Sequence, residues 1–194
     1  MVDENELMRA IADGDNTAYC NAVRQHIKPI SHYAFRMLGN SKDTEDITQE
    51  TFLRLWTHAD KWNPEKASLT TWLHRIAHNL CIDYLRKDKS SQSDDIDDAD
   101  WQDISTTDNS DEQERVKDLN RAIAALPERQ RSALLLCQYQ GFSNKQTAQI
   151  LDISVDALES ILARARRSLK QQLIDHAQSK PKTTKTKQRV QEQS

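Results

Sequence analysis

Apolar residues recur along this chain at the three- and four-residue spacing of α-helices, and regular two-residue alternation is almost absent. Only three glycines occur in 194 residues and β-branched runs are rare, which also argues against sheets. The pattern therefore predicts an all-α protein, in which Pro29 kinks or divides the second helix. The expected helices span about residues 5–12, 17–38, 41–58, 68–87, 113–126 and 127–140, with a short and a longer helix within 141–173.

The segment from Gly141 to Leu173 has the sequence form of a helix-turn-helix, which lays one helix into the DNA major groove. Ser143 and Gln146 have the spacing of a capping box, and Ser154 suits the N-cap of the longer helix. The buried side of that helix is predicted to hold Val155, Leu158, Leu162, Ala165 and Leu169. Its opposite face carries Asp156, Glu159, Ser160, Ala163, Arg164, Arg167 and Lys170. An ordinary amphipathic helix pair with a solvated charged face is the alternative.

The expected helix at 68–87 combines an apolar stripe with a basic side, and a basic loop precedes it. The stripe holds Leu69, Trp72, Leu73, Ile76, Ala77, Leu80, Tyr84 and Leu85, whereas another side holds Arg75, His78, Asn79, Ile82, Arg86 and Lys87. The loop supplies Lys61, Trp62 and Lys66. Cations can follow phosphates and an exposed ring can stack on an unpaired base, so this surface suits single-stranded nucleic acid. Taken alone, a charged face near a tryptophan is more often a solvated surface.

The expected helix at 41–58 is acidic instead. Its acidic face holds Asp43, Glu45, Asp46, Gln49 and Glu50, and its buried side holds Ile47, Phe52, Leu55 and Trp56. An acidic face argues against phosphate contact and in favour of a basic protein partner.

Charge is distributed unevenly around a net value of −3. Residues 88–112 hold ten acidic groups, one basic group and few apolar side chains, which predicts a flexible acidic linker. This linker separates a helical domain at 1–87 from a second one at 113–175, which carries a net charge of +3. Residues 176–194 carry +4 and are predicted to be a disordered basic tail. Local charge governs phosphate contact more than the total does, so the net acidity does not exclude DNA binding.

Taken together, these segments resemble the bacterial sigma-70 family, and in particular its extracytoplasmic function (ECF) group. DTEDITQETFLRLW followed by SLTTWLHRIAHNLCIDYLRK is similar to sigma domain 2. LPERQRSALLLCQYQGFSNKQTAQILDISVDALESILARARRSL is similar to sigma domain 4. The resemblance covers about residues 7–173 in the family's order and spacing. It implies two small helical domains joined by an acidic flexible linker.

The resemblance also implies roles for individual residues. Asp46, Gln49, Glu50 and Leu53 fall where the family docks on the clamp helices of the RNA polymerase β′ subunit. The loop 61–67, with Lys61, Trp62 and Lys66, falls where a flipped base of the −10 element is captured. Arg75, Asn79 and Arg86 fall on the face that meets the opened strand. Glu159, Ser160, Ala163 and Arg164 fall at −35-reading positions, and Lys145, Arg166 and Arg167 are candidates for phosphate contacts.

Asp156 and Glu159 depart from the family, because many relatives carry Gly or Arg near the start of this helix. These carboxylates repel phosphate, although a glutamate can accept a hydrogen bond from cytosine N4. They leave the −35 sequence open.

The resemblance implies a transcription initiation factor and not an enzyme. Its expected partners are core RNA polymerase, through the β′ clamp helices and the β subunit flap, promoter DNA at −10 and −35, and an anti-sigma factor. No apolar run approaches the ~20 residues of a membrane span, and the N-terminus lacks the form of a signal peptide. A cytoplasmic location without membrane insertion is expected.

Two other functions remain open at this stage. A LuxR-type regulator shares a similar helix-turn-helix, but usually has a sensory domain with a βα alternation that is absent before residue 113. A metal site is the second alternative, because His74, His78 and Cys81 stand at i, i+4 and i+7 of one helix. We expect both histidines on a solvated or DNA-facing side of the helix at 68–87, which argues against a metal site. No nucleophile–base group or glycine-rich phosphate loop is found, so no catalytic residue or cofactor is expected.

Overall fold

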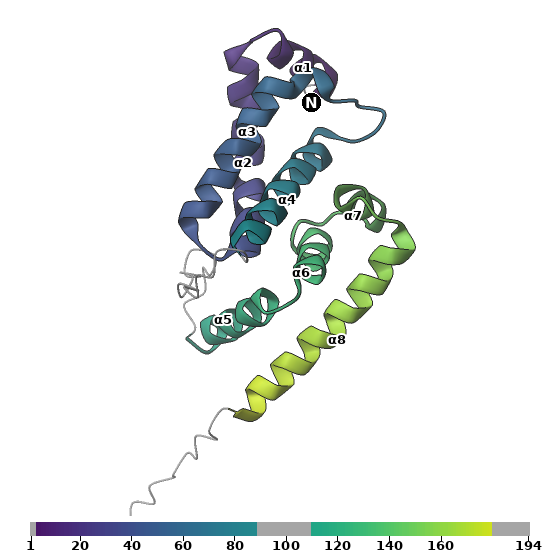
Figure 1. Ribbon diagram of the computed structural model, residues 1–194. Helices are drawn as coiled ribbons and strands as arrows, with labels where there is room; N and C mark the ends of the chain where they lie inside the picture. The colour runs from purple at the N-terminus through teal and green to yellow at the C-terminus, as the bar shows by residue number, and fades with distance from the viewer. Residues whose placement is uncertain (1–2, 89–109, 180–194) are drawn as a thin grey trace, which may run out of the picture.

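All regular elements in the described residues, 3–88 and 110–179, are helices in the computed structural model (Figure 1). The N-terminal half, residues 3–88, contains α1 (Glu4–Ala12), α2 (Asn16–Leu38), α3 (Ser41–His58), the 3-10 turn η1 (Ala59–Lys61) and α4 (Leu69–Asp88). The C-terminal half, residues 110–179, contains α5 (Ser110–Ala124), α6 (Glu128–Leu134), the π-helical turn η3 (Leu135–Tyr139), α7 (Asn144–Leu151) and α8 (Val155–Ser179). The predicted all-α fold class is confirmed.

Side-chain caps explain where several helices begin. Asp15 accepts hydrogen bonds from the backbone amides of Thr17 (2.7 Å) and Ala18 (3.2 Å) at the start of α2. The predicted capping box is present at α7, where the side chains of Ser143 and Gln146 each accept from the other's backbone amide. The Ser154 hydroxyl accepts from the amide of Ala157 (3.1 Å), which confirms its predicted capping of α8.

The structure differs from the expected helices in three places. Helix α2 is not divided at Pro29, one of the two effects expected there, because fully buried Ile30 and Tyr33 hold the following turn in the core and outweigh the lost hydrogen bond. The helix expected at 127–140 ends as a π-turn, in which the amide of Gln140 donates to the carbonyl of Leu135 (3.0 Å). Helix α8 continues to Ser179, past the predicted start of the tail at residue 176.

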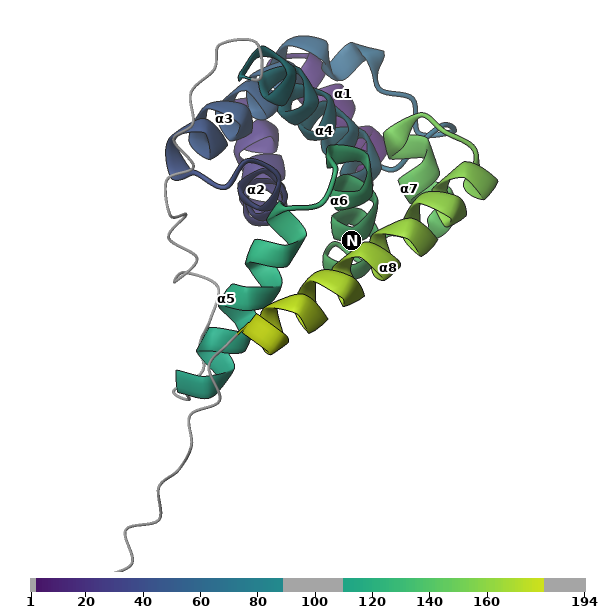
Figure 2. The same cartoon turned by 60° about the horizontal axis from the view of Figure 1, so that its bottom comes forward.

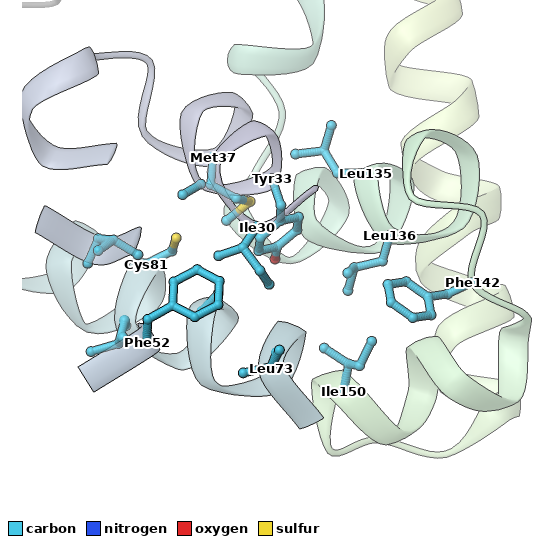
Figure 3. Packing of buried hydrophobic residues seen from close by; sticks show 14 of the residues in the cluster. Ile30, Tyr33, Met37, Phe52, Leu73, Cys81, Leu135, Leu136, Phe142 and Ile150 are labelled. Atoms are coloured by element: carbon cyan, nitrogen blue, oxygen red, sulfur yellow. The ribbon is translucent and has the colours of Figure 1, made fainter. Parts of the chain in front are cut away.

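The two halves share one hydrophobic core (Figure 3). Its members from the N-terminal half include Ile30, Tyr33, Met37, Phe52 and Leu73, and those from the C-terminal half include Leu135, Leu136, Phe142 and Ile150. A second, smaller cluster belongs to the C-terminal half alone and holds Ala133 of α6 with Ala148, Leu158 and Leu162 of α7 and α8. The C-terminal half therefore has a core of its own and also packs on the N-terminal half.

Several predictions fall outside the described residues. They include the acidic linker over 89–109 and the basic tail over 180–194, so the predicted domain boundaries remain predictions. Within the described ranges, no helix is both long enough and apolar enough to cross a bilayer.

Candidate nucleic-acid interface

The loop before α4 is closed by its own tryptophan. The Trp62 indole N–H donates to the carbonyl of Ala67 (3.1 Å), and the ring is half-buried against the core. Trp62 was predicted to be an exposed stacking ring, but in this conformation it supports the loop. Lys61 and Lys66 are exposed, as are Asn63, Pro64 and Glu65 between them.

The start of α4 is fixed by contacts with α1 and with the loop itself. Glu4 on α1 accepts a hydrogen bond from the amide of Leu69 (3.0 Å), and the Ser68 hydroxyl accepts from the amide of Thr71 (3.3 Å). A carboxylate and a hydroxyl thus satisfy free amides at the first turn. The fixed helix presents Arg75, Asn79 and Arg86 as exposed side chains, as the sequence predicts for a binding face.

The histidines of α4 were predicted on a solvated or DNA-facing side, and this prediction is wrong. His78 is buried against α2, where the Tyr33 hydroxyl and His78 Nδ1 form a hydrogen bond of 2.9 Å. Burial, followed by the positive charge of Arg86, lowers the pKa of His78 to about 4. His74 is also buried, its Nδ1 bonded to the carbonyl of Thr70 (2.8 Å), and its ring lies edge-on to Phe142 at 4.7 Å between centroids. Both imidazoles are therefore part of the core.

The suggested metal ligands are not brought together. Among residues 3–88 and 110–179, no three His, Cys, Asp or Glu side chains are placed to hold a metal ion. Burial raises the pKa of the Cys81 thiol to about 12, which opposes the thiolate that a metal needs. The i, i+4, i+7 spacing in this helix instead follows from packing.

Helix α8 presents the second candidate face. Figure 2 shows it on the outer side of the molecule, with α6 between it and α4. The predicted base-reading residues Glu159, Ser160, Ala163 and Arg164 are all exposed. Arg164 Nε donates back to the carbonyl of Ser160 (3.2 Å), which orients its guanidinium along the helix surface. Asn144 Nδ2 donates to Glu159 Oε1 (3.4 Å), so the first turn of α7 helps to hold the acidic side chain.

The candidate phosphate contacts Lys145, Arg166 and Arg167 are all exposed. Lys145 on α7 and Arg167 on α8 are exposed, and Arg167 Nε donates to the carbonyl of Ala163 (3.4 Å). Arg166 instead lines an open groove with Leu169, Lys170, Leu173 and Ile174. Val155, predicted on the buried side, is 38% exposed because it begins the helix at the outer end of the turn.

The acidic helix α3 divides its carboxylates between the interior and the surface. Asp43 accepts a hydrogen bond from the Tyr84 hydroxyl (2.6 Å). This bond joins the first turn of α3 to the C-terminal part of α4. The predicted partner-binding positions face outward: Asp46 and Gln49 are exposed, and Glu50 is partly exposed in an ion pair with Arg54 (2.8 Å). Leu53 beside them is 52% exposed. An exposed leucine among acidic side chains favours a protein surface as the partner.

Sequence reasoning missed the polar residues that join the two halves. Arg131 on α6 donates to the carbonyl of Met37 on α2 (2.6 Å), and Arg36 on α2 donates to Asn120 on α5 (2.8 Å). Gln149 on α7 donates to the carbonyl of Lys66. Their partners are backbone atoms or residues 83 to 94 positions away. A single sequence does not indicate that an arginine, a residue usually exposed, will form such a long-range hydrogen bond.

Comparison with known proteins assigns both halves. Residues 22–91 match Sigma-70 region 2, and residues 117–169 match Sigma-70 region 4. The ECF RNA polymerase sigma factor SigE of Mycolicibacterium smegmatis is 31% identical over 86% of this chain, which spans 66% of that relative's length. SigM of Mycobacterium tuberculosis is 30% identical, with 84% of this chain and 81% of the relative covered. SigW of Bacillus subtilis is 29% identical, with 87% and 95% covered.

Solved structures agree on the fold. CnrH in complex with the cytosolic domain of CnrY has a TM-score of 0.66 at 24% identity, covering 89% of this chain and 97% of that one. RpoE in complex with the anti-sigma factor NepR, from Bartonella quintana, has a TM-score of 0.63 at 22% identity, covering 80% and 96%.

A match to region 2 before residue 113 does not favour a LuxR-type regulator, since that segment would instead hold a sensory domain. The two regions occur in the order that the sequence predicted. The chain belongs to the extracytoplasmic function group of the sigma-70 family of RNA polymerase sigma factors.

Proposed function

We propose that this protein binds core RNA polymerase and directs it to promoters whose −10 and −35 elements are read by its two halves. The observation that carries the proposal is that each matched region presents an exposed polar face on a rigid helix, α4 in one and α8 in the other. The protein is an initiation factor without catalytic residues of its own. Acting on polymerase places it in the cytoplasm.

At −10, the proposed contacts divide between the loop and α4. Lys61 and Lys66 attract the backbone of the opened strand, and Arg75, Asn79 and Arg86 follow it along α4. Capture of an unstacked base costs a few kcal/mol, roughly the stacking that is lost. Trp62 supports this step by holding the loop closed through its bond to Ala67.

At −35, α8 lies in the major groove. Arg164 and Ser160 read base edges, Ala163 allows close approach, and Glu159 accepts from an exocyclic amine such as cytosine N4. Lys145, Arg166 and Arg167 are proposed to contact phosphates around this site. The hydrogen bond from Asn144 limits the orientations of the Glu159 side chain. It thereby restricts which bases Glu159 can contact.

Polymerase binding is assigned to the exposed side of α3. Asp46, Gln49 and Glu50 supply hydrogen-bond acceptors, and Leu53 supplies an apolar anchor among them. The β subunit flap is the proposed partner of the C-terminal half. We also propose control by an anti-sigma factor that covers these polymerase-binding faces, because RpoE, a protein of the same fold, is solved with the anti-sigma factor NepR.

Transcription in vitro tests the function directly. Core polymerase with this protein is expected to initiate from specific sites in a genomic library, whereas core alone is not. Absence of any transcript that depends on the added protein would contradict the proposal.

The role of α8 is tested by Arg164→Ala. Loss of a base-edge contact of about 1–3 kcal/mol predicts roughly tenfold weaker use of promoters with an intact −35 element. Arg129→Ala is the matched control, because Arg129 is an exposed arginine of α6 outside the proposed face. An equal loss for Arg164→Ala on a template without a −35 element would contradict the assigned role.

A further inference from the structure

The C-terminal part of α8 carries an open groove, of which the proposed function uses only one residue. This α8 groove is lined by Arg166, Leu169, Lys170, Leu173 and Ile174. Its side chains form two rows with a spacing of four residues, one of leucines and one in which two cations precede Ile174. Both cations are exposed, and Ile174 is 39% exposed. The match to region 4 ends at residue 169, so most of the groove lies beyond the matched part of the chain.

Apolar side chains flanked by cations suit an acidic segment that carries bulky apolar residues. This chain contains such a segment. Residues 94–104, outside the described residues, read DDIDDADWQDI and hold six aspartates, no basic residue, and Ile96, Trp101 and Ile104. Residues 180–194, also outside the described residues, carry a net charge of +4 and are repelled by the same cations. Charge complementarity therefore selects residues 94–104.

The acidic segment can reach the α8 groove without any movement of the helices. Helix α5 packs on α8 and begins at Ser110, shortly after the segment (Figure 2). An extended chain spans at most about 20 Å over the six residues from Ile104 to Ser110, and about 30 Å over the nine residues from Trp101. The groove itself extends only about 12 Å along α8, at 1.5 Å per residue.

A second copy of the chain is a poorer occupant. In a symmetric dimer the same face meets itself, so the two cations of one copy would lie against those of the other. The groove is also lined by five residues of one helix, whereas a stable interface takes about 20–30 residues on each side. A segment of the same chain needs no such area, because its linkage gives an effective concentration in the millimolar range.

We propose that residues 94–104 bind the α8 groove of the same chain, with Trp101 and Ile104 on its apolar side chains and aspartates beside Arg166 and Lys170. The aspartates then occupy the position of DNA phosphates, because Arg166 is a proposed phosphate contact. Binding of the segment lowers the affinity of the C-terminal half for DNA of any sequence. Only this consequence rests on the proposed function, since the contact itself involves no DNA.

A spin label beside the α8 groove tests the contact in the full chain. The label is attached at Gln171→Cys, an exposed position that does not line the groove, with Cys20 and Cys137 replaced by serine. In the nuclear magnetic resonance spectrum of isotope-labelled protein, the amide signals of residues 94–104 are expected to lose most of their intensity. Trp101→Ser should restore these signals, whereas Trp101→Phe, which keeps an aromatic ring, should not.

Charge reversal on α8 supplies the matched comparison. Lys170→Glu should restore the signals of residues 94–104, and Arg167→Glu should not, because Arg167 is an exposed cation of the same helix that does not line the groove. Equal signal loss in all variants would overturn the proposal, because the label would then report only the proximity of residues that precede α5. In a mixture of spin-labelled and isotope-labelled molecules, signal loss in the isotope-labelled copy would overturn it in favour of a second copy.

The consequence for DNA is measured by fluorescence anisotropy with a duplex of random sequence. Trp101→Ser keeps all six aspartates, so a gain in affinity reports release of the groove and not a change of net charge. If the segment occupies the groove in about two thirds of molecules, its release raises DNA affinity about threefold. Equal DNA affinities for Trp101→Ser and Trp101→Phe, together with restored amide signals in Trp101→Ser alone, would support the contact and count against Arg166 as a phosphate contact.

Discussion

At the residue scale, His78 couples the fold to pH. Burial and the charge of Arg86 lower its pKa from 6.5 to about 4, so the unfolded chain binds more protons between these values. The stability that depends on neutral His78 is therefore complete above pH 6.5 and is lost as the pH falls toward 4. The free energy of unfolding, measured with urea, is expected to fall by about 2 kcal/mol from pH 7 to pH 5 on account of His78.

His78→Asn is the matched variant for this prediction, because the amide can still bond Tyr33 but does not titrate. Its stability should depend less steeply on pH. Burial also lowers the pKa values of His74 and His26, so the free energy of unfolding of the variant should still fall with pH to a smaller extent. An unchanged slope in His78→Asn would show that His78 is not the group responsible.

At the element scale, Leu53 on α3 is expected to contribute to binding of core polymerase and not to the stability of the fold. It is 52% exposed, so Leu53→Ala should leave the free energy of unfolding nearly unchanged. As an apolar anchor in a polymerase interface, it should contribute to affinity for core polymerase, and its loss should weaken binding roughly tenfold, or about 1.4 kcal/mol. Binding is measured by titrating labelled protein with core enzyme.

Ile27→Ala supplies the comparison for this experiment. Ile27 is an exposed apolar residue of similar size, 43% exposed, and it lies on α2 and not on α3. The Ile27→Ala protein should bind core polymerase with the affinity of the wild type. Equal weakening by the two substitutions would mean that α3 holds no specific docking site.

Some features of the helices are determined by residues nearby in the sequence, and others are not. Ser143, Gln146 and Ser154 specify the helix starts around the turn, because their partners lie within three residues. The undivided course of α2 through Pro29 was not predictable locally, since it depends on burial of the neighbouring residues. The α4 histidines were misplaced for the same reason. Their exposure is decided by elements distant in sequence, such as Tyr33 and Phe142.

At the scale of the whole molecule, the association of the two halves was the main feature that pattern reasoning did not reach. The acidic segment 88–112 indicated two separate units, and hydrophobic periodicity predicts which side of a helix is buried but not which helix covers it. Leu135, Leu136 and Ile150 were consistent with a core inside the C-terminal half, yet they belong to the cluster that contains Tyr33 and Met37. Family membership could be recognised without this information because the sequence motifs that carry it are local to α3, α4 and the helices around the turn.

A shared core predicts that the two halves unfold together. Trp56, Trp62 and Trp72 all lie in the N-terminal half, so tryptophan fluorescence reports that half once Trp101 is replaced by phenylalanine. Far-UV circular dichroism reports the helices of both halves. In the Trp101→Phe protein the two signals should give coincident urea transitions, as expected for one cooperative unit.

Arg131→Leu in that background should separate the two transitions, because it leaves the carbonyls of Met37, Ala124 and Leu126 without their shared donor. Hydrogen bonds to a charged donor contribute about 1.5–3 kcal/mol each, so the loss should be about 3 kcal/mol or more. Gln138→Leu removes an exposed polar side chain nearby and should leave the transitions coincident. Separate transitions before any change at Arg131 would show that the apolar contacts between the halves do not couple their folding.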